Sequence, residues 1–184
     1  MQLVEIRRVL RNKSSKKAKE STKKFVPTIK KYYGTRAWVV NEILKNIKEL
    51  DSKLVEQLWK SGFFEEQLLA SKILGKFCLI NPDKTLKLIR RFSKDIIDWA
   101  ICDTLATQGV KKIIKIKQKE IFKISKELIK SNNLWQRRFA LVLLINYQKD
   151  KKLRKEIKNI MKQVQNDQEY YVKKALIWLK NGLK

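Results

Sequence analysis

A period of about 35 residues is the feature of this sequence that most restricts its fold. Three stretches of similar character end in alanine: EEQLLA at 65–70, WQRRFA at 135–140 and YYVKKA at 170–175. Their alanines lie 70 and then 35 residues apart, and the intermediate position falls on Leu105. Helix pairs that recur at such a period are typical of α-solenoids, in which each unit packs on its neighbours. A long helical bundle is the alternative, but a bundle has no reason to repeat every 35 residues.

The composition also favours an all-α chain with one domain over residues 1–184. Only five glycines and two prolines interrupt long runs of helix-forming residues, so we predict ten to twelve helices. A hydrophobic content of 43% is too high for a disordered basic tail. The second expected helix is capped by Ser14 and runs past Phe25 and Pro27 toward Tyr32, and the stretch 111–129 holds one or two helices. The other expected helices span 3–10, 36–50, 53–60, 65–80, 85–92, 95–107, 135–147, 151–164 and 167–179.

The net charge indicates the kind of partner. Lys and Arg number 44 against 18 Asp and Glu, a formal charge of +26, and residues 1–33 are predicted to form basic N-terminal helices. This excess is larger than solubility needs and is typical of proteins that bind phosphates, although a hot habitat can also enrich lysine. We therefore predict an α-solenoid of HEAT-like helix pairs with a basic concave groove. The sequence has no run of about eighteen apolar residues and no signal-peptide core, so we expect a cytoplasmic protein that does not bind membranes.

The residues that are absent exclude several kinds of site. The chain has no histidine and only two cysteines, Cys78 and Cys102, so zinc centres of Cys and His, Ser–His or Cys–His nucleophiles and a disulfide framework are not expected. Neither common glycine-rich phosphate loop occurs. We expect no metal and no cofactor, and any chemistry must use carboxylates, aromatic rings and cations.

One candidate site lies in the stretch DWAICD at 98–103. Trp99 and Asp103 are four residues apart, which places them one turn apart on one face of a helix. Asp103, Arg138 and Lys173 follow each other at intervals of 35 residues and should occupy equivalent positions on successive repeats. The alternative is that Trp99 is an ordinary core residue and Asp103 an ordinary ion-pair partner.

An aromatic row runs beside this charged row. Trp99, Trp135 and Tyr170 recur within one residue of the same register. Such a pair of rows suits a phosphate backbone with bases or sugars against the rings. For Trp135 and Tyr170, however, we expect packing between repeats, the commoner role of repeated aromatic residues.

Four motifs together resemble a known family. LWKS at 58–61, DWAICD at 98–103, NLWQRRFA at 133–140 and EYYVKKALIW at 169–178 look like the AlkD family, HEAT-like-repeat DNA glycosylases that remove alkylated purines. The resemblance runs from about Tyr33 to Trp178. It implies that Asp103 is the catalytic carboxylate, that Trp99 and Trp178 are active-site tryptophans, and that Arg138 is the active-site arginine. Ala100 differs from the acidic residue that often follows the first tryptophan.

The chemistry of alkylated purines agrees with these residues. Alkylation at N3 or N7 makes the base cationic, so it can leave without a general acid. Asp103 would then stabilise an oxocarbenium-like sugar and orient water. Trp99 and Trp178 would hold the sugar and the cationic lesion by cation–π attraction, and Arg138, expected at the surface, would bind a phosphate with little effect on stability. Further DNA contacts are predicted for Arg137, Lys173 and Lys174.

The sequence thus predicts a monofunctional DNA glycosylase that acts as a monomer on double-stranded DNA containing alkylated purines. No lysine stands in an isolated apolar setting that would activate it for Schiff-base chemistry. A non-enzymatic HEAT-repeat module that binds distorted or branched DNA is the first alternative, and a protein-scaffolding solenoid the second. Replacement of Asp103 by asparagine should separate the enzyme from the DNA-binding module.

Overall fold

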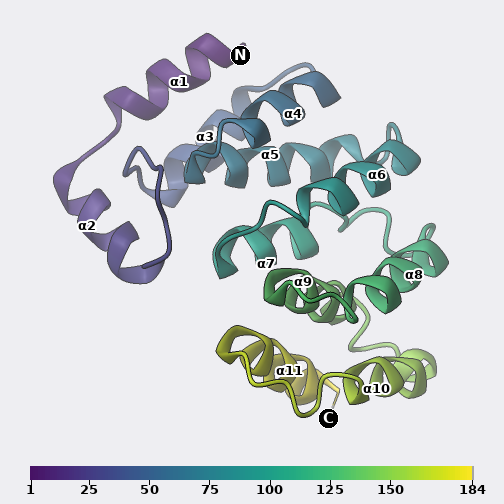
Figure 1. Cartoon of the computed structure of the whole chain (residues 1–184). Helices are drawn as coiled ribbons and strands as arrows, with labels where there is room; N and C mark the ends of the chain where they lie inside the picture. The colour runs from purple at the N-terminus through teal and green to yellow at the C-terminus, as the bar shows by residue number, and fades with distance from the viewer. Residues whose placement is uncertain (184) are drawn as a thin grey trace.

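The computed structural model describes residues 1–183. Within them the chain forms eleven α-helices, one short 3-10 helix and no strand, which confirms the predicted all-α, helical-repeat fold (Figure 1). No helix in residues 1–183 has the length and apolar character that crossing a membrane would require. The helices are α1 (Leu3–Asn12), α2 (Lys16–Phe25), α3 (Ala37–Asn46), α4 (Ser52–Lys60), α5 (Phe64–Phe77), α6 (Pro82–Phe92), α7 (Trp99–Gln108), α8 (Gln118–Leu128), α9 (Leu134–Ile145), η1 (Lys151–Leu153), α10 (Arg154–Lys162) and α11 (Tyr170–Gly182).

From α3 onward the helices form two layers. Helices α3, α5, α7, α9 and α11 lie side by side in chain order, and we call them the inner layer (Figure 1). Helices α6, α8 and α10 lie beside them, to the right in Figure 1, and α4 packs on α5; we call these four helices the outer layer. Each pair of an inner and an outer helix therefore stacks on the next pair, as the period in the sequence predicts.

Small residues allow the inner helices to approach closely. The repeated alanines Ala70, Ala140 and Ala175 are all fully buried. Gly75 of α5 lies so near α7 that a Cβ atom there would collide with the carbonyl oxygen of Gln108. The close stacking of α5 on α7 thus depends on a residue without a side chain.

Four predicted helices differ from those observed by four residues or more at one end. The helix predicted at 36–50 ends at Asn46, and the helix predicted at 95–107 begins at Trp99. Helix α2 ends at Phe25, so the predicted continuation toward Tyr32 is wrong, and Pro27 explains the end because it disfavours helical geometry at Val26. Its cap is Ser15, whose hydroxyl accepts the backbone N–H of Ala18. Residues 111–117 form turns, so only 118–128 of the stretch 111–129 are α-helical.

Candidate active site

Helix α7 begins at Trp99 because the residue before it caps the helix. The Asp98 carboxylate accepts the backbone N–H of Ile101 at 2.9 Å, which satisfies a donor in the first turn. Asp98 is only 1% exposed, and this burial raises its pKa to about 6. The cap fixes Trp99 as the first residue of α7, and Asp103 follows one turn later on the same side.

Asp103 is paired with Arg138, the residue 35 positions further along the chain. Arg138 donates from Nε to Oδ1 of Asp103 at 3.0 Å and from Nη2 to Oδ2 at 2.7 Å. This two-pronged contact joins α7 to α9 and follows directly from the repeat. Arg138 is only 5% exposed, so the expectation of a surface arginine is wrong. The predicted contact of Arg138 with a phosphate stays a prediction.

A third helix completes this arrangement. Nη1 of Arg138 donates to the backbone carbonyl oxygen of Tyr171 on α11 at 2.6 Å. The guanidinium therefore connects α7, α9 and α11, and its position is fixed from two sides. The Asp103 side chain keeps 17% of its surface exposed, so the carboxylate is held by the interior but still reaches solvent.

The pKa of Asp103 reflects these surroundings. Burial raises it above its ordinary value, and the hydrogen bonds and positive charge of Arg138 oppose that rise. The carboxylate therefore depends on one guanidinium to remain ionised in a mostly buried position.

Trp99 is half-buried and contacts the N-terminal part of the chain. Its indole N–H donates to the carbonyl oxygen of Phe25 at 3.3 Å, and the two rings lie 5.6 Å apart at an angle of 48°. Trp178, on the same side of α11 as Tyr171 and two turns further along, is 41% exposed. Trp99 is thus no ordinary core residue, and the role of Trp178 stays a prediction.

The other two members of the aromatic row differ from each other. Trp135 is half-buried with its ring 4.9 Å from that of Tyr171, so the expected packing between repeats is confirmed. Tyr170 is 61% exposed, and the same expectation is wrong for it. The ammonium of Lys174 lies 5.4 Å from the centre of the Tyr170 ring.

The residues predicted to contact DNA differ in their contacts within the protein. Arg137 donates to both carboxylate oxygens of Asp167, at 2.6 and 3.3 Å, and to the carbonyl oxygens of Ser131 and Asn132. Its guanidinium thereby ties the segment before α9 to the segment before α11. Lys173 and Lys174 are exposed on α11. The part that these three residues play in DNA binding stays a prediction.

The sequence motifs assigned no role to two contributors to the site. Tyr171 acts through its backbone carbonyl, which no side-chain pattern reveals. Phe25 precedes Trp99 by 74 residues and lies outside the repeats. Its only mark in the sequence is that it is an aromatic residue in a run of lysines.

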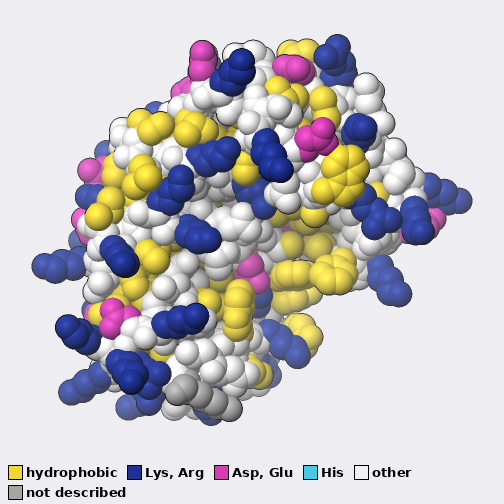
Figure 2. Space-filling view, turned by 180° about the vertical axis from the view of Figure 1, so that it is seen from behind, with side chains coloured by type: hydrophobic (Ala, Val, Ile, Leu, Met, Phe, Trp, Pro, Cys, Tyr) yellow, Lys and Arg dark blue, Asp and Glu magenta, His cyan; other side chains and the backbone are white. Residues whose placement is uncertain are grey.

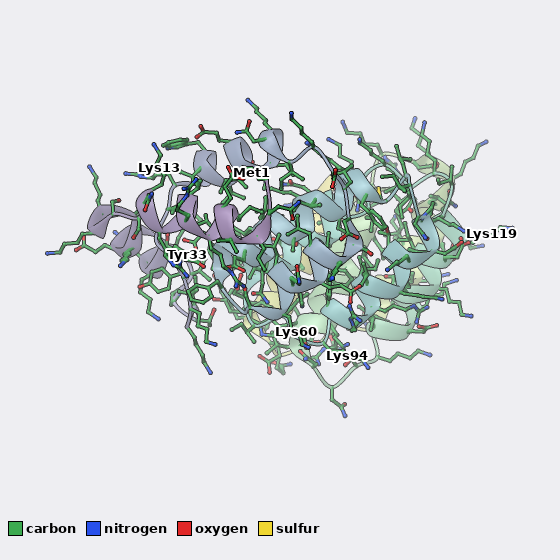
Figure 3. The ribbon with its side chains drawn as sticks, turned by 90° about the horizontal axis from the view of Figure 1, so that it is seen from above. Met1, Lys13, Tyr33, Lys60, Lys94 and Lys119 are labelled. Carbon is green, nitrogen blue, oxygen red and sulfur yellow. The ribbon has the colours of Figure 1, made fainter. Side chains whose placement is uncertain are left out.

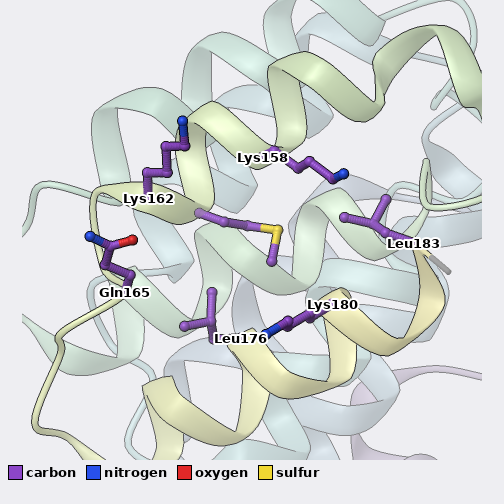
Figure 4. Close-up of a pocket in the computed structure, with 7 residues that line it drawn as sticks. Lys158, Lys162, Gln165, Leu176, Lys180 and Leu183 are labelled. Atoms are coloured by element: carbon purple, nitrogen blue, oxygen red, sulfur yellow. The ribbon is translucent and has the colours of Figure 1, made fainter.

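One face of the molecule is hollowed. Figure 2 shows a hollow in which acidic side-chain atoms lie among hydrophobic side chains, with lysines and arginines around it. A cavity of about 580 Å³ lies elsewhere, between α10 and α11, and none of the candidate residues lines it (Figure 4). Within residues 1–183 no group of three or more Cys, Asp or Glu side chains is placed to hold a metal ion.

Comparison with known proteins places the chain in a family. A comparison with curated proteins found no match. The model of one family, described as DNA alkylation repair enzyme, matches residues 6–180. The match runs from within α1 to within α11 and includes α2, which lies outside the motifs in the sequence. The chain therefore belongs to the DNA alkylation repair enzyme family.

Proposed function

We propose that this member of the family is a monofunctional DNA glycosylase that hydrolyses the N-glycosidic bond of cationic N3- or N7-alkylated purines in duplex DNA. The observation that carries the proposal is the fixed position of the Asp103 carboxylate. It is held on both oxygens by Arg138, it remains accessible, and it lies one turn from the half-buried Trp99. A fixed carboxylate that reaches solvent is the group that a developing sugar cation requires.

The reaction needs one carboxylate and one water. As the bond between C1′ and the purine nitrogen breaks, its electron pair neutralises the cationic base, and positive charge develops on the sugar. Asp103 stabilises that charge and orients a water molecule, whose oxygen bonds to C1′ while one of its protons passes to solvent. The oxygens of Asp103 retain acceptor capacity for this water, because each has two lone pairs and Arg138 takes one N–H contact to each.

Arg138 acts in this proposal as a positioning residue. Its three side-chain hydrogen bonds go to Asp103 and to the Tyr171 carbonyl, so it sets the orientation and the charge of the carboxylate. Such preorganisation matters most where no pocket encloses the reacting atoms.

The substrate is held by aromatic and basic side chains. Trp99 and Trp178 provide indole faces for the sugar and for the cationic base. The exposed Lys173 and Lys174 contact the phosphate backbone. Arg137 is already engaged with Asp167, so its predicted DNA contact requires that this ion pair rearrange.

The experiment that tests the proposal measures free base released from duplex DNA containing 7-methylguanine. Asp103→Asn should lower release by about 100- to 1,000-fold, as the loss of one electrostatic stabiliser does in other enzymes, and should leave DNA binding intact. Asp83→Asn is the matched control, because Asp83 is 73% exposed on the outer helix α6. Equal release by Asp103→Asn and the wild type would refute the proposal. Binding by the wild type without release of base would favour the alternative, a non-enzymatic module for distorted or branched DNA.

A further inference from the structure

The cavity of about 580 Å³ between α10 and α11 has an apolar floor. The floor consists of Met161 on α10, Leu176 on α11 and Leu183 directly after α11. Met161 and Leu183 are 8% and 7% exposed and Leu176 is half-buried, so solvent still reaches these three side chains. The volume of the cavity lies within the range of about 300 to 1,000 Å³ that is usual for ligand sites.

Three lysines form the rim of this cavity. Lys158 and Lys162 lie on the α10 side and Lys180 on the α11 side, and all three are exposed (Figure 4). The remaining lining residue is Gln165, so no carboxylate among the described residues borders the cavity. Within residues 1–183 none of the three lysines forms an ion pair. The cavity therefore combines an apolar floor with a cationic rim whose charge is not compensated by this part of the chain.

The cavity and the candidate active site lie on opposite sides of α11. Leu176 and Trp178 are two residues apart, which corresponds to a rotation of about 200° around the helix axis. Lys180, four residues after Leu176, shares the side of the cavity. Lys174, four residues before Trp178, shares the side of the candidate active site. An occupant of the cavity would therefore leave the Trp178 side of α11 free.

The chemistry of the lining indicates the class of occupant. A second copy of this chain has a net charge of +26 and would bring mostly like charge to the rim. A nucleic acid would find no aromatic ring in the described lining on which to stack a base. An acidic peptide fits both parts of the cavity, because one large apolar side chain can cover the floor while neighbouring carboxylates meet the lysines.

We propose that the cavity between α10 and α11 binds an acidic segment of a partner protein, which inserts one large apolar side chain over the floor and pairs its carboxylates with the lysines of the rim. The apolar contact supplies most of the affinity, because exposed ion pairs contribute little by themselves. The lysines restrict binding to acidic segments and speed their approach. Because the two sites lie on opposite sides of α11, the partner and DNA can be bound at the same time.

Fluorescence anisotropy with a synthetic peptide tests the proposal. The probe is a fluorescein-labelled peptide of four aspartates followed by leucine and phenylalanine, and the control peptide has serines in place of the last two residues. At about 0.15 M salt, where charges more than about 8 Å apart are largely screened, the probe should bind at least about tenfold more tightly than the control peptide. Equal affinities, or no binding of the probe, would overturn the proposal.

Charge substitutions test whether the probe binds at the rim. A variant with all three rim lysines replaced by glutamine should bind the probe about tenfold or more weakly than the wild type. The matched control carries Lys13→Gln, Lys60→Gln and Lys94→Gln, which remove the same charge from exposed positions. Figure 3 shows Lys13 well apart from Lys60 and Lys94, so the control does not remove a second patch. The control should bind within about twofold of the wild type, and equal weakening in both variants would overturn the proposal.

A substitution in the floor separates the apolar contact from the charge. Leu176→Gln makes a half-buried position of the floor polar and leaves the three lysines in place. It should weaken binding of the probe about tenfold and leave binding of the serine peptide unchanged. Thermal unfolding checks that the variant is folded. A folded variant that binds the probe as tightly as the wild type would overturn the proposal.

Duplex DNA tests whether the cavity is separate from the nucleic-acid surface. Saturating DNA should change the Kd of the probe by less than about threefold, because the two sites lie on opposite sides of α11 and distant charges are screened. Displacement of the probe by DNA would overturn the proposal, since the cavity would then bind nucleic acid. A protein that binds the probe at the rim but neither binds duplex DNA nor releases base would refute the proposed function and support the peptide site.

Discussion

The pair of Asp103 and Arg138 allows the strongest test of the site. Arg138→Met keeps the apolar stem of the side chain and removes all three hydrogen bonds of the guanidinium. Asp103 would then be left mostly buried without its cation, and the Tyr171 carbonyl would lose a donor. The sequence alone led us to expect almost no effect on stability, so the structure reverses that expectation.

The size of the effect follows from burial. Breaking a fully buried ion pair costs about 3 to 5 kcal/mol. Asp103 retains 17% exposure of its side chain, so we expect a smaller loss, about 2 to 4 kcal/mol near pH 7. For a chain of this size that corresponds to a fall in Tm of about 4 to 16 °C. Arg91→Met is the control, because Arg91 forms an exposed ion pair with Glu56 and should change stability by less than about 1 kcal/mol.

The stability loss caused by Arg138→Met should depend on pH. Without Arg138 the pKa of Asp103 should rise further, because burial already raises it and the guanidinium opposes that rise. The mutant then loses stability as pH increases through this higher pKa, so its deficit against the wild type should be smaller near pH 4 than near pH 7. In single-turnover release of 7-methylguanine, the acid limb of the pH profile should move to higher pH.

A double-mutant cycle completes the test. In a background of Asp103→Asn, the further change Arg138→Met should cost much less than it does in the wild type, because no buried charge is left unpaired. Thermal unfolding of the four proteins measures this coupling. An unchanged Tm for Arg138→Met, together with an unmoved acid limb, would refute the positioning role of Arg138.

Three other changes test the surroundings of the site. Asp98→Asn keeps the helix cap. The wild-type carboxyl has a pKa of about 6, against about 4 in an unfolded chain, so the wild type loses stability as pH rises from 4 to 6. In denaturant unfolding at pH 7, the free energy of unfolding of the mutant should exceed that of the wild type by up to about 3 kcal/mol. Gly34→Ala, at a φ of +78°, should cost at least about 1 to 2 kcal/mol, and an unchanged unfolding midpoint would contradict this. Gly75→Ala should separate α5 from α7 and cost about 1 to 3 kcal/mol in thermal unfolding.

The sequence predicts the repeat correctly because the period determines which backbone positions lie next to each other. Positions 35 residues apart lie side by side on neighbouring helices, which is why Asp103 and Arg138 meet. The period could not show how deeply each side chain is buried. Arg138 was therefore expected to bind a phosphate at the surface, whereas its donors are satisfied by a carboxylate and a backbone carbonyl in the interior.

The N-terminal part was harder to predict because it has no period. Its path depends on Pro27, on the turn at Gly34 and on two glutamates of α5 that read, in sequence, as an ordinary acidic first turn of a helix. Buried carboxylates and exposed ones look alike in a sequence. The contact of Phe25 with Trp99 joins residues 74 positions apart and depends on this irregular path.

The placement of the site across three repeats explains how an open face could support catalysis. An enclosed pocket orients its groups through the walls around them, whereas the hydrogen bonds that hold Asp103 come from a single guanidinium. Its orientation comes instead from α9, through Arg138, and the orientation of Arg138 comes in turn from α11. The stacking of rigid helix pairs thus takes over the task that a pocket performs elsewhere, and one side of the carboxylate stays free for a substrate as large as a DNA duplex. It follows that a substitution that shifts α7, α9 or α11 relative to one another should impair base release even where it leaves the fold and every candidate side chain in place.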